Sequence, residues 1–383
     1  MTRQIKQYLF SLWLRPVRGI IKHTTIIFFY LRLGIKKLIR LFGINVITVN
    51  YTISKIEGIE SKLILAFEKI NFPIIPLFKG RESTEHFDHV VYTIPRGKVF
   101  WSYTIATPSN EILRDVTWRH NVGIGTNLYA YKLFPWKTTQ IPWTTAVLCW
   151  NDTDKNYHHR ITTIVPKYYI FKKSGIKIDT YIADTNLWFH REWREALWID
   201  ISQIIPSDPH AYYQCDTLIC TNTTTVFGII QPRAKKFLCE IFLKDRAQVV
   251  ANRKVYIKRI TNRKIANETE FEKLMTDYGF QISVLDGMTI RQQAELFYEA
   301  KIVIWPHGAW LTNMIFSQPW TKVIELFHPQ TIFGHYYAMA WSLWFDYTPL
   351  VWKMKLDTKK IEMDNDIIVD IEQVRKVLKT ITY

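Results

Sequence analysis

The pattern of hydrophobic and polar positions is clearest in the last third of the chain, where short apolar runs alternate with amphipathic stretches. Buried strands are predicted at 255–258, 280–285, 301–305 and 322–326. The stretches between them have helical spacing, and right-handed crossovers force strands joined in this way into a parallel sheet. The pattern therefore predicts an α/β domain in this region.

Residue types at the expected helix ends agree with this interpretation. Asn267 with Glu270, and Thr289 with Gln292, have the spacing of a capping box. Gly279 is expected to end the first of these helices, because glycine readily adopts the left-handed conformation common after a helix. The first helix therefore has a sequence signal at each end, and the second has one at its N-terminus.

Upstream, strands and turns dominate before longer helical segments begin near Tyr157. The β-rich runs lie at 45–53, 89–94 and 99–105. A helix predicted at 232–246 leads into a polar linker, and the domain boundary is placed there.

We therefore predict three parts. Residues 1–44 form a basic amphipathic segment, residues 45–245 an N-terminal domain with a β-rich first part, and residues 246–383 a C-terminal domain that ends in a helix over 370–380.

Size and composition indicate an ordinary globular protein. The chain has 383 residues, of which 48% are hydrophobic and 22% charged, so two domains can each bury a core. The cysteines lack paired metal-ligand spacing, which predicts free thiols in a reducing compartment. They are Cys149, Cys215, Cys220 and Cys239.

The net charge of +16 is concentrated at the start of the chain, because residues 1–42 contain nine Lys and Arg and no acid. The longest uncharged apolar run there, 24–31, is far shorter than the ~20 residues that span a bilayer. One interpretation is an amphipathic helix on an anionic membrane surface, which predicts a cytoplasmic protein peripheral to the inner face of the cell membrane. The alternative is a basic helix packed on its own domain. No nucleic-acid-binding motif supports a third interpretation of the charge.

Candidate chemistry gathers where two predicted strands end. Arg259 and Arg263 follow one strand, and His307-Gly308-Ala309 follows another. Ligands of open parallel sheets bind beyond the carboxyl ends of the strands, where helix N-termini present N–H groups to anions. Guanidinium groups give permanently charged, bidentate donors to phosphate. Both loops are therefore expected to face one phosphate-binding crevice.

These residues resemble the signature of glycosyltransferase family 61, whose members include capsular polysaccharide biosynthesis-like enzymes. The resemblance runs from about residue 85 to 375, and upstream Asn156-Tyr-His-His159 with Pro166 is similar to a second segment of the family. The C-terminal block is Val255-Tyr-Ile-Lys-Arg259, Arg263, Asn267-Glu268, Gly279-Phe280, Gln293, Leu296-Phe297, Ala300, Pro306-His307-Gly308-Ala309, Leu311-Thr-Asn313, Phe316 and Val323-Ile-Glu325.

The resemblance implies an inverting transferase with GT-B architecture, in which two Rossmann-like domains face a cleft. It implies a nucleotide-sugar donor, with UDP-sugars favoured, and a glycan or lipid-linked saccharide acceptor in surface polysaccharide or glycoconjugate synthesis. A final helix that packs back across the cleft is also expected from this architecture.

Sugar transfer from a nucleotide diphosphate leaves a charged diphosphate, which fixed cations and N–H dipoles can stabilise. Asp152-Thr-Asp154, an Asp-x-Asp candidate, sits in a predicted turn, so we expect no metal and no other cofactor.

The individual roles follow from this chemistry. Arg259 and Arg263 are predicted to hold the diphosphate, with His307, Gly308 and Ala309 alongside. Asn313 is expected either to contact the donor or to hold the loop. Glu325 is expected to accept the ribose hydroxyls, or else to be a satisfied carboxylate near a helix N-terminus.

Inverting transfer also needs a base for the acceptor hydroxyl, and a histidine with a pKa near neutrality suits that role. His159 is the first candidate and His158 its rival. The next residue is Arg160, where the family usually has Trp.

Tryptophan marks a second departure from the family, because several Trp residues stand where relatives typically have Gly. These are Trp101, Trp198, Trp305, Trp310, Trp320 and Trp344, with Trp143 and Trp150 as further candidates. One hypothesis is that a glycine codon, such as a reassigned stop codon, is written as Trp. The alternative is a divergent or inactive protein that binds nucleotides or glycans and retains the fold.

Overall fold

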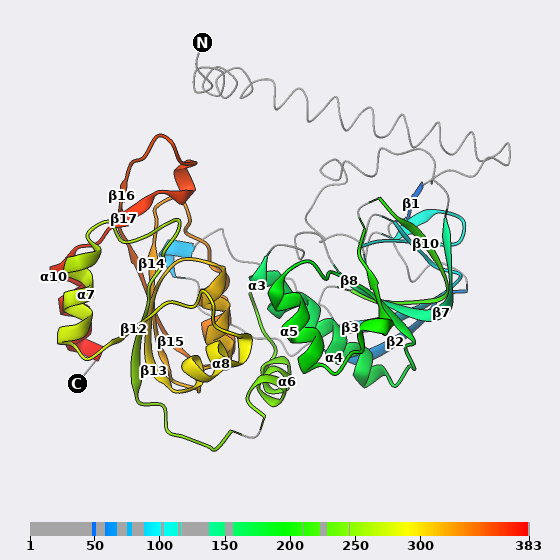
Figure 1. Ribbon diagram of the computed structural model, residues 1–383, viewed down its shortest axis with the longest axis horizontal. Coiled ribbons are helices and arrows are strands. Elements are labelled where there is room, and N and C mark those ends of the chain that lie inside the picture. Colours follow the sequence, from blue (N-terminus) through cyan, green and yellow to red (C-terminus); the bar gives the residue numbers. More distant parts are fainter. Residues whose placement is uncertain are drawn as a thin grey trace, which may run out of the picture.

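The computed structural model describes two sheets with helices packed between them (Figure 1). The predicted basic segment over residues 1–44 lies outside the described residues, as do Trp101 and Trp150. The described residues are 48–50, 58–66, 75–78, 88–100, 103–113, 116, 138–149, 156–208, 210–222, 228–244 and 246–381.

The sheet of the C-terminal half has five strands, all parallel. The alternating pattern predicted a parallel sheet with four of these strands, and the fifth, at 346–351, was not predicted. Its strand order is β12-β11-β13-β14-β15, so the order reverses between β11 and β13. The strands are β11 (Arg253–Ile257), β12 (Gln281–Ser283), β13 (Ala300–Pro306), β14 (Lys322–Phe327) and β15 (Asp346–Val351). The connections are α7 (Glu268–Asp277), α8 (Ile290–Tyr298), the 3-10 helix η7 (Ala309–Phe316) and α9 (His335–Ser342).

The helix ends of this domain test the predicted caps. Thr289 accepts the N–H of Gln292 at 3.1 Å and donates its own N–H to the Gln292 side chain at 2.8 Å, which confirms that capping box. The predicted capping box at Asn267 is wrong. Its amide group instead bonds the backbone of Val369, donating to the carbonyl at 2.9 Å and accepting from the N–H at 3.0 Å. The side chain of Asn267 therefore forms hydrogen bonds with the distant backbone of Val369 instead of capping α7.

The predicted final helix is present as α10 (Ile371–Ile381), but its expected position across the cleft is wrong. It packs against α7 at the outer end of the molecule (Figure 1). Val374 and Leu378 are buried there in one cluster with Phe271 and Leu274. A hairpin of β16 (Lys353–Lys355) and β17 (Asp366–Ile368) precedes this helix.

The first sheet is mixed rather than fully parallel. Its path runs β1-β6-β5-β4-β10-β7-β8-β9, and β3, which also pairs with β2, pairs with β10. Only β10, β7, β8 and β9 form a continuous parallel stretch, so this half has a short Rossmann-like part within a larger sheet. The run at 99–105, predicted as one strand, is an antiparallel pair, β4 and β5. The strands are β1 (Thr48–Asn50), β2 (Glu60–Leu65), β3 (His89–Pro95), β4 (Lys98–Phe100), β5 (Thr104–Ala106), β6 (Glu111–Leu113), β7 (Thr139–Leu148), β8 (Thr180–Ala183), β9 (Ile204–Pro206) and β10 (Tyr212–Thr221).

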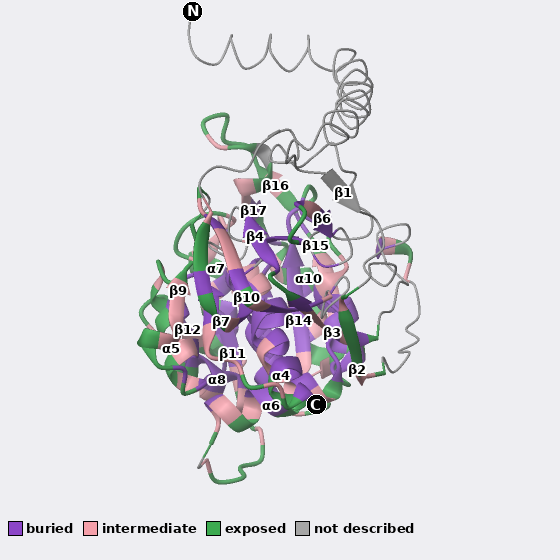
Figure 2. Ribbon diagram, turned by 90° about the vertical axis from the view of Figure 1, so that its right-hand side faces the viewer, coloured by how far each residue is buried: buried purple, intermediate pink, exposed green. Residues whose placement is uncertain are grey.

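Helices between the sheets join the two halves through a shared hydrophobic core. Leu148 and Tyr157 from the first half belong to the same buried cluster as Val303 and Met314 from the second. Figure 2 shows buried residues along α4 and β14, with exposed residues at the periphery. The helices of the first half are α3 (Tyr157–His159), the π-helical segment η5 (Arg160–Ile164), α4 (Val165–Ser174), α5 (Trp188–Ala196) and α6 (Pro232–Phe242). Because α6 contacts α4 as well as α8 and η7, the domain division at residue 245 stays a prediction.

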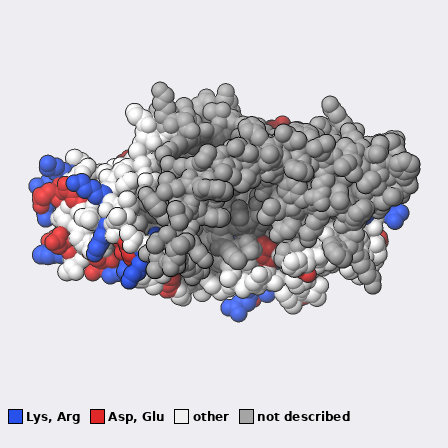
Figure 3. All heavy atoms as spheres, turned by 90° about the horizontal axis from the view of Figure 1, so that it is seen from above, with Lys and Arg blue, Asp and Glu red and all other residues white. Residues whose placement is uncertain are grey.

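Charges on the described surface are mixed in sign. Figure 3 shows Lys and Arg beside Asp and Glu at the end of the molecule that carries α7 and α10. Within the described residues, no helix combines the length and the apolar character that a bilayer crossing needs.

Candidate functional site

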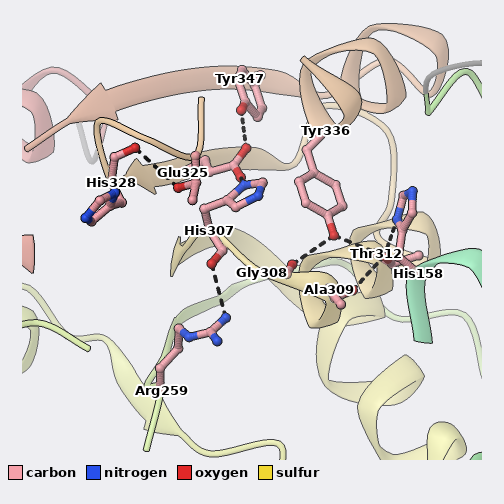
Figure 4. Close-up of polar contacts among 11 residues, drawn as sticks. His158, Arg259, His307, Gly308, Ala309, Thr312, Glu325, His328, Tyr336 and Tyr347 are labelled. Carbon is pink, nitrogen blue, oxygen red and sulfur yellow. Dashed lines mark hydrogen bonds and ion pairs between the residues drawn. The ribbon is translucent and has the colours of Figure 1, made fainter. Parts of the chain in front are cut away.

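The two predicted phosphate-binding loops meet at the point where the strand order reverses. β11 and β13 are adjacent and parallel, so the residues that follow them emerge at the same sheet edge. Arg259 donates from Nη1 to the carbonyl oxygen of His307 at 3.1 Å and from Nε to that of Asn262 at 2.7 Å. Figure 4 shows the carbonyl and the ring of His307 pointing in opposite directions, the carbonyl toward Arg259. Both loops therefore share one site, at the edge where α/β sheets bind ligands.

Gly308 allows this approach because it has no side chain. Its φ of 173° is extended and suits any residue, so backbone conformation does not require glycine here. A Cβ atom, however, would stand 1.8 Å from Nη1 of Arg259. The guanidinium therefore lies directly on the backbone of residue 308.

The guanidinium groups of Arg259 and Arg263 both lie at this edge of the sheet. Burial and the neighbouring Arg263 lower the pKa of Arg259 to about 10. Burial likewise lowers the pKa of Arg263, whose Nε lies 3.9 Å from the Asp364 carboxylate. Arg263 also has a φ of +58°. Both groups remain charged at neutral pH, and a bound anion would relieve the cost of burying them together.

His307 is fixed on its other side by Glu325. Its Nδ1 lies 2.5 Å from one carboxylate oxygen of Glu325, which is fully buried. The Tyr347 hydroxyl donates to the other oxygen, and burial with the nearby carboxylate raises the pKa of this phenol, so it keeps its proton. Glu325 lies behind His307, engaged on both oxygens, a position suited to orienting the imidazole rather than to meeting a ribose.

A second set of hydrogen bonds reaches His158. Its Nδ1 lies 2.7 Å from the hydroxyl of Thr312, which donates to the carbonyl oxygen of Ala309 at 2.7 Å. The nearby Tyr336 hydroxyl, 3.3 Å from Thr312, donates to the carbonyl oxygen of Gly308 at 2.8 Å. Burial raises the pKa of Tyr336, which therefore stays protonated.

With Thr312 donating to the carbonyl oxygen of Ala309, these bonds favour one tautomer of His158. A hydroxyl carries one proton and a carbonyl oxygen can only accept, so the proton of Thr312 goes to Ala309 and that of Tyr336 to Gly308. The Thr312 oxygen can then only accept from Nδ1 of His158. In the neutral imidazole the lone pair lies on Nε2, the arrangement that a general base requires. The ring of His159 lies beside that of His158, at 5.3 Å between centroids.

Asn313 is a link between the halves of the molecule. It is fully buried, accepts a hydrogen bond from the Tyr157 hydroxyl at 2.6 Å and donates to the side chain of Gln293 at 2.6 Å. Its side-chain oxygen and nitrogen thus hold η7 to α3 and α8. Of the two roles expected for Asn313, these contacts are those of a residue that holds the loop.

Arg160 is also integral to the core. The side chain is fully buried, pairs with Asp184 at 2.6 Å and lies 5.1 Å from the centre of the Trp193 ring. It begins the π-helical segment that directly follows the two histidines. Segments of this kind often occur at functional sites.

Trp310 lies in η7 beside the same site. Its ring is 4.5 Å from that of Tyr157 and stacks on Trp188, with 5.8 Å between centroids and 16° between planes. The three rings form one aromatic group around Trp310, and Tyr157 directly precedes His158 in the chain.

Several contributors to the site were not predicted from the sequence. Thr312 lies within the Leu311-Thr-Asn313 run, and its position between two motif residues was the available signal. Tyr336 and Tyr347 lie on α9 and β15 with no local pattern that points to the site. The part of the chain that the structure describes contains no group of three or more His, Cys, Asp or Glu residues able to hold a metal ion.

Comparison with known families adds one finding. The model of the family described as Glycosyltransferase 61 matches residues 138–324. The match includes His158, Arg259, Gly308 and Thr312, and it ends one residue before Glu325. No curated protein matches the chain.

Proposed function

We propose an inverting, metal-independent enzyme, because residues 138–324 match the glycosyltransferase family 61 model, which confirms the resemblance and implies a glycosyltransferase. It transfers a sugar from a nucleotide-sugar, with UDP as the carrier, to a glycan or lipid-linked saccharide in surface polysaccharide or glycoconjugate synthesis. The proposed architecture is GT-B-like, with the parallel sheet as the donor side and the mixed sheet as the acceptor side.

The donor diphosphate binds the guanidinium groups of Arg259 and Arg263 in this proposal. The observation that carries it is the contact between Arg259 and the backbone of His307 and Gly308 at the reversal of strand order. Two partly buried guanidinium groups, one of which helps to lower the pKa of the other, lie where a parallel sheet binds ligands and suit a diphosphate. His307, held by Glu325, lies beside them.

The acceptor proton goes to His158. Nε2 takes the proton from the acceptor hydroxyl as its oxygen attacks the anomeric carbon from the face opposite the diphosphate. The bond from that carbon to the diphosphate oxygen breaks, and the leaving group carries its charge to the two arginines. Contacts from His158 through Thr312, Tyr336 and Gly308 connect the base to the diphosphate side.

A charge-removal experiment tests the proposal. We expect Arg259→Ala to weaken UDP binding by about 10- to 100-fold, the loss expected for a hydrogen bond to a charged group. Transfer should fall at least as far. Arg253→Ala is the matched control, because it removes the same charge from the opposite end of β11, where Arg253 pairs with Glu299 at 2.9 Å. Equal UDP binding by both variants would contradict the diphosphate role.

A non-catalytic nucleotide- or glycan-binding protein is the second candidate. The observation in its favour is the indole of Trp310, which packs against Tyr157 and Trp188 where an acceptor or sugar would lie next to His158. UDP release from common UDP-sugars distinguishes the two functions. Measurable UDP binding without any release would favour the binding protein.

Attachment to an anionic membrane surface through residues 1–42 completes the proposal, with the enzyme at the cytoplasmic face. Deleting these residues should release the protein from vesicles that contain anionic lipid, with the fold intact by circular dichroism. Misfolding after the deletion would instead support a helix packed on its own domain.

A further inference from the structure

Three tryptophans adopt a backbone conformation that favours glycine. Trp198, Trp320 and Trp344 have φ values of +58°, +67° and +63°. In this region the Cβ of an L-residue crowds the following carbonyl oxygen, so a bulky residue there is an outlier. Among the described residues, six non-glycine residues have positive φ, and three are Trp, although Trp makes up only 15 of 383 residues. Chance placement would put far fewer there.

Trp198 ends α5 in a position with a specific hydrogen-bond pattern. Its N–H donates to the carbonyl of Glu195 at 3.0 Å, and the N–H of Ile199 donates to that of Arg194 at 3.2 Å. These two bonds define the Schellman motif, in which the residue with positive φ is usually glycine.

Trp344 ends α9 in the same way. Its N–H donates to the carbonyl of Trp341 at 3.4 Å, and the N–H of Phe345 donates to that of Ala340 at 2.8 Å. The position of Trp344 in the motif is the same as that of Trp198.

Gly279 shows what the chain normally places there. At the end of α7 its N–H donates to the carbonyl of Thr276 at 2.9 Å, and the N–H of Phe280 donates to that of Met275 at 2.9 Å, with a φ of +75° at the glycine. Three helices thus end in one motif, one with Gly and two with Trp.

Trp320 lies in a turn, at a position that also favours glycine. It follows Pro319, and the N–H of Thr321 approaches the carbonyl of Gln318 at 3.3 Å. Proline followed by a residue of positive φ defines a type II turn, whose second central position calls for glycine.

Packing does not explain these side chains. Trp198, Trp320 and Trp344 are 87%, 73% and 64% exposed, whereas the core residue Trp193 is 1% exposed. A largely exposed indole gives little burial energy to offset a strained backbone.

We propose that residues 198, 320 and 344 are glycine in the protein as its own cell makes it, because their shared codon is one that some genetic codes read as tryptophan and others as glycine. The low glycine content agrees with this, at 14 of 383 residues against the ~7% usual in proteins.

If residue 310 has the same codon, it is also glycine in the native protein, and the candidate site is more open. This extension to residue 310 rests on the proposed function. Trp310 has an ordinary backbone conformation, so its φ carries no argument, but its indole fills the space between Tyr157 and Trp188. Glycine there would leave a space for a sugar ring between the side chains of Trp188 and Tyr157, the residue that precedes His158.

The codons and the native protein give the first test. We expect residues 198, 320 and 344 to share one codon other than TGG, and peptides from the native source to have the mass of glycine at each position. TGG codons, or tryptophan-containing peptides, would overturn the proposal.

Stability of the full chain gives a second test. Trp198→Gly, Trp320→Gly and Trp344→Gly should each raise Tm by about 2 °C or more, because the strain is removed. Trp341→Gly is the control, since Trp341 is 43% exposed within α9 and glycine destabilises a helix interior. A fall in Tm for the three variants like that of the control would also overturn the proposal.

Trp310→Gly distinguishes a failure of the glycine assignment from a failure of the proposed transferase function. A chain with all four glycines is expected to release UDP from a UDP-sugar faster than the Trp310 chain. If the three Tm increases occur and no UDP is released, the glycine assignment holds and the transferase function fails.

Discussion

Gly308 lies so close to Arg259 that a Cβ on residue 308 would stand 1.8 Å from the guanidinium nitrogen Nη1. The glycine is therefore required by a neighbour's side chain and not by its own backbone, whose φ is 173°. A pair of positions in the loops that follow two adjacent parallel strands, β11 and β13, thus sets where the positive charge lies. The site depends on this packing as much as on the charge itself.

Gly308→Ala should displace the guanidinium and leave the fold in place. We expect UDP affinity to fall about 10-fold or more, because a charge-assisted contact is lost, with little change in Tm. Gly334→Ala is the control, since its Cβ would meet Phe78 at 3.6 Å, an ordinary contact. Isothermal titration with UDP measures both. Unchanged affinity in Gly308→Ala would show that Arg259 does not bind the diphosphate from this position.

The sequence predicted the parts of the site that depend on local rules. Arg259 and the His307-Gly308 turn follow strands that alternate with helices, and a parallel sheet must bring such strand ends to one edge. Thr289 capped its helix as expected because its partner, Gln292, lies three residues away.

The predictions failed, or were silent, where distant segments meet. Asn267 bonds Val369, about one hundred residues away, so its cap spacing was overridden by a contact that no local pattern contains. Tyr336 and Tyr347 reach the site only through the packing of α9 and β15. The position of α10 likewise depends on which apolar face it finds, and that face is on α7.

The buried ion pair between Arg160 and Asp184 predicts a large loss of stability when it is broken. The two groups are 2.6 Å apart, with side-chain exposures of 0% and 3%. Asp184→Asn should lower the free energy of unfolding by about 3–5 kcal/mol, because it leaves a buried charge without its partner. Urea unfolding measures the change.

Asp277→Asn is the matched control, because Asp277 forms an exposed pair with Lys273 at 3.0 Å. Such pairs contribute only about 0.3–0.5 kcal/mol. Equal effects of the two substitutions would mean that Arg160 finds another partner after Asp184 is changed.

His89 predicts a loss of stability in mild acid. Burial, with help from Arg233, lowers the pKa of this histidine from 6.5 to about 4. Between these values the unfolded chain binds the proton and the folded protein does not, so stability falls as pH drops from about 6.5 to 4. The contribution is about 3 kcal/mol or slightly more.

Replacing His89 with Gln should therefore flatten the dependence of unfolding free energy on pH across this window. His210→Gln serves as the control, since His210 is exposed. Urea unfolding at several pH values compares the variants with the parent. An identical acid limb in the parent and in His89→Gln would show that other groups cause the loss.

The contact between His158 and Thr312 separates the two candidate bases. If His158 is the base, His158→Gln should lower kcat about 10²- to 10⁴-fold and leave UDP affinity nearly unchanged, while His159→Gln should have a much smaller effect. Thr312→Val removes the oxygen that accepts from Nδ1, so it should lower kcat and shift the pH below which activity is lost. That shift distinguishes a residue that positions the base from one that only supports the fold.

Thr321→Val controls for the loss of a buried hydroxyl. Thr321 donates to the carbonyl of Gln318 at 2.8 Å and is buried, but it lies at the start of β14, away from the strand ends that form the site. Thr321→Val should lower stability with no change in the pH profile.

A larger loss of kcat in His159→Gln than in His158→Gln would assign the base to His159. The tautomer argument would then fail, because the proton on Nδ1 of His158 would have no catalytic consequence.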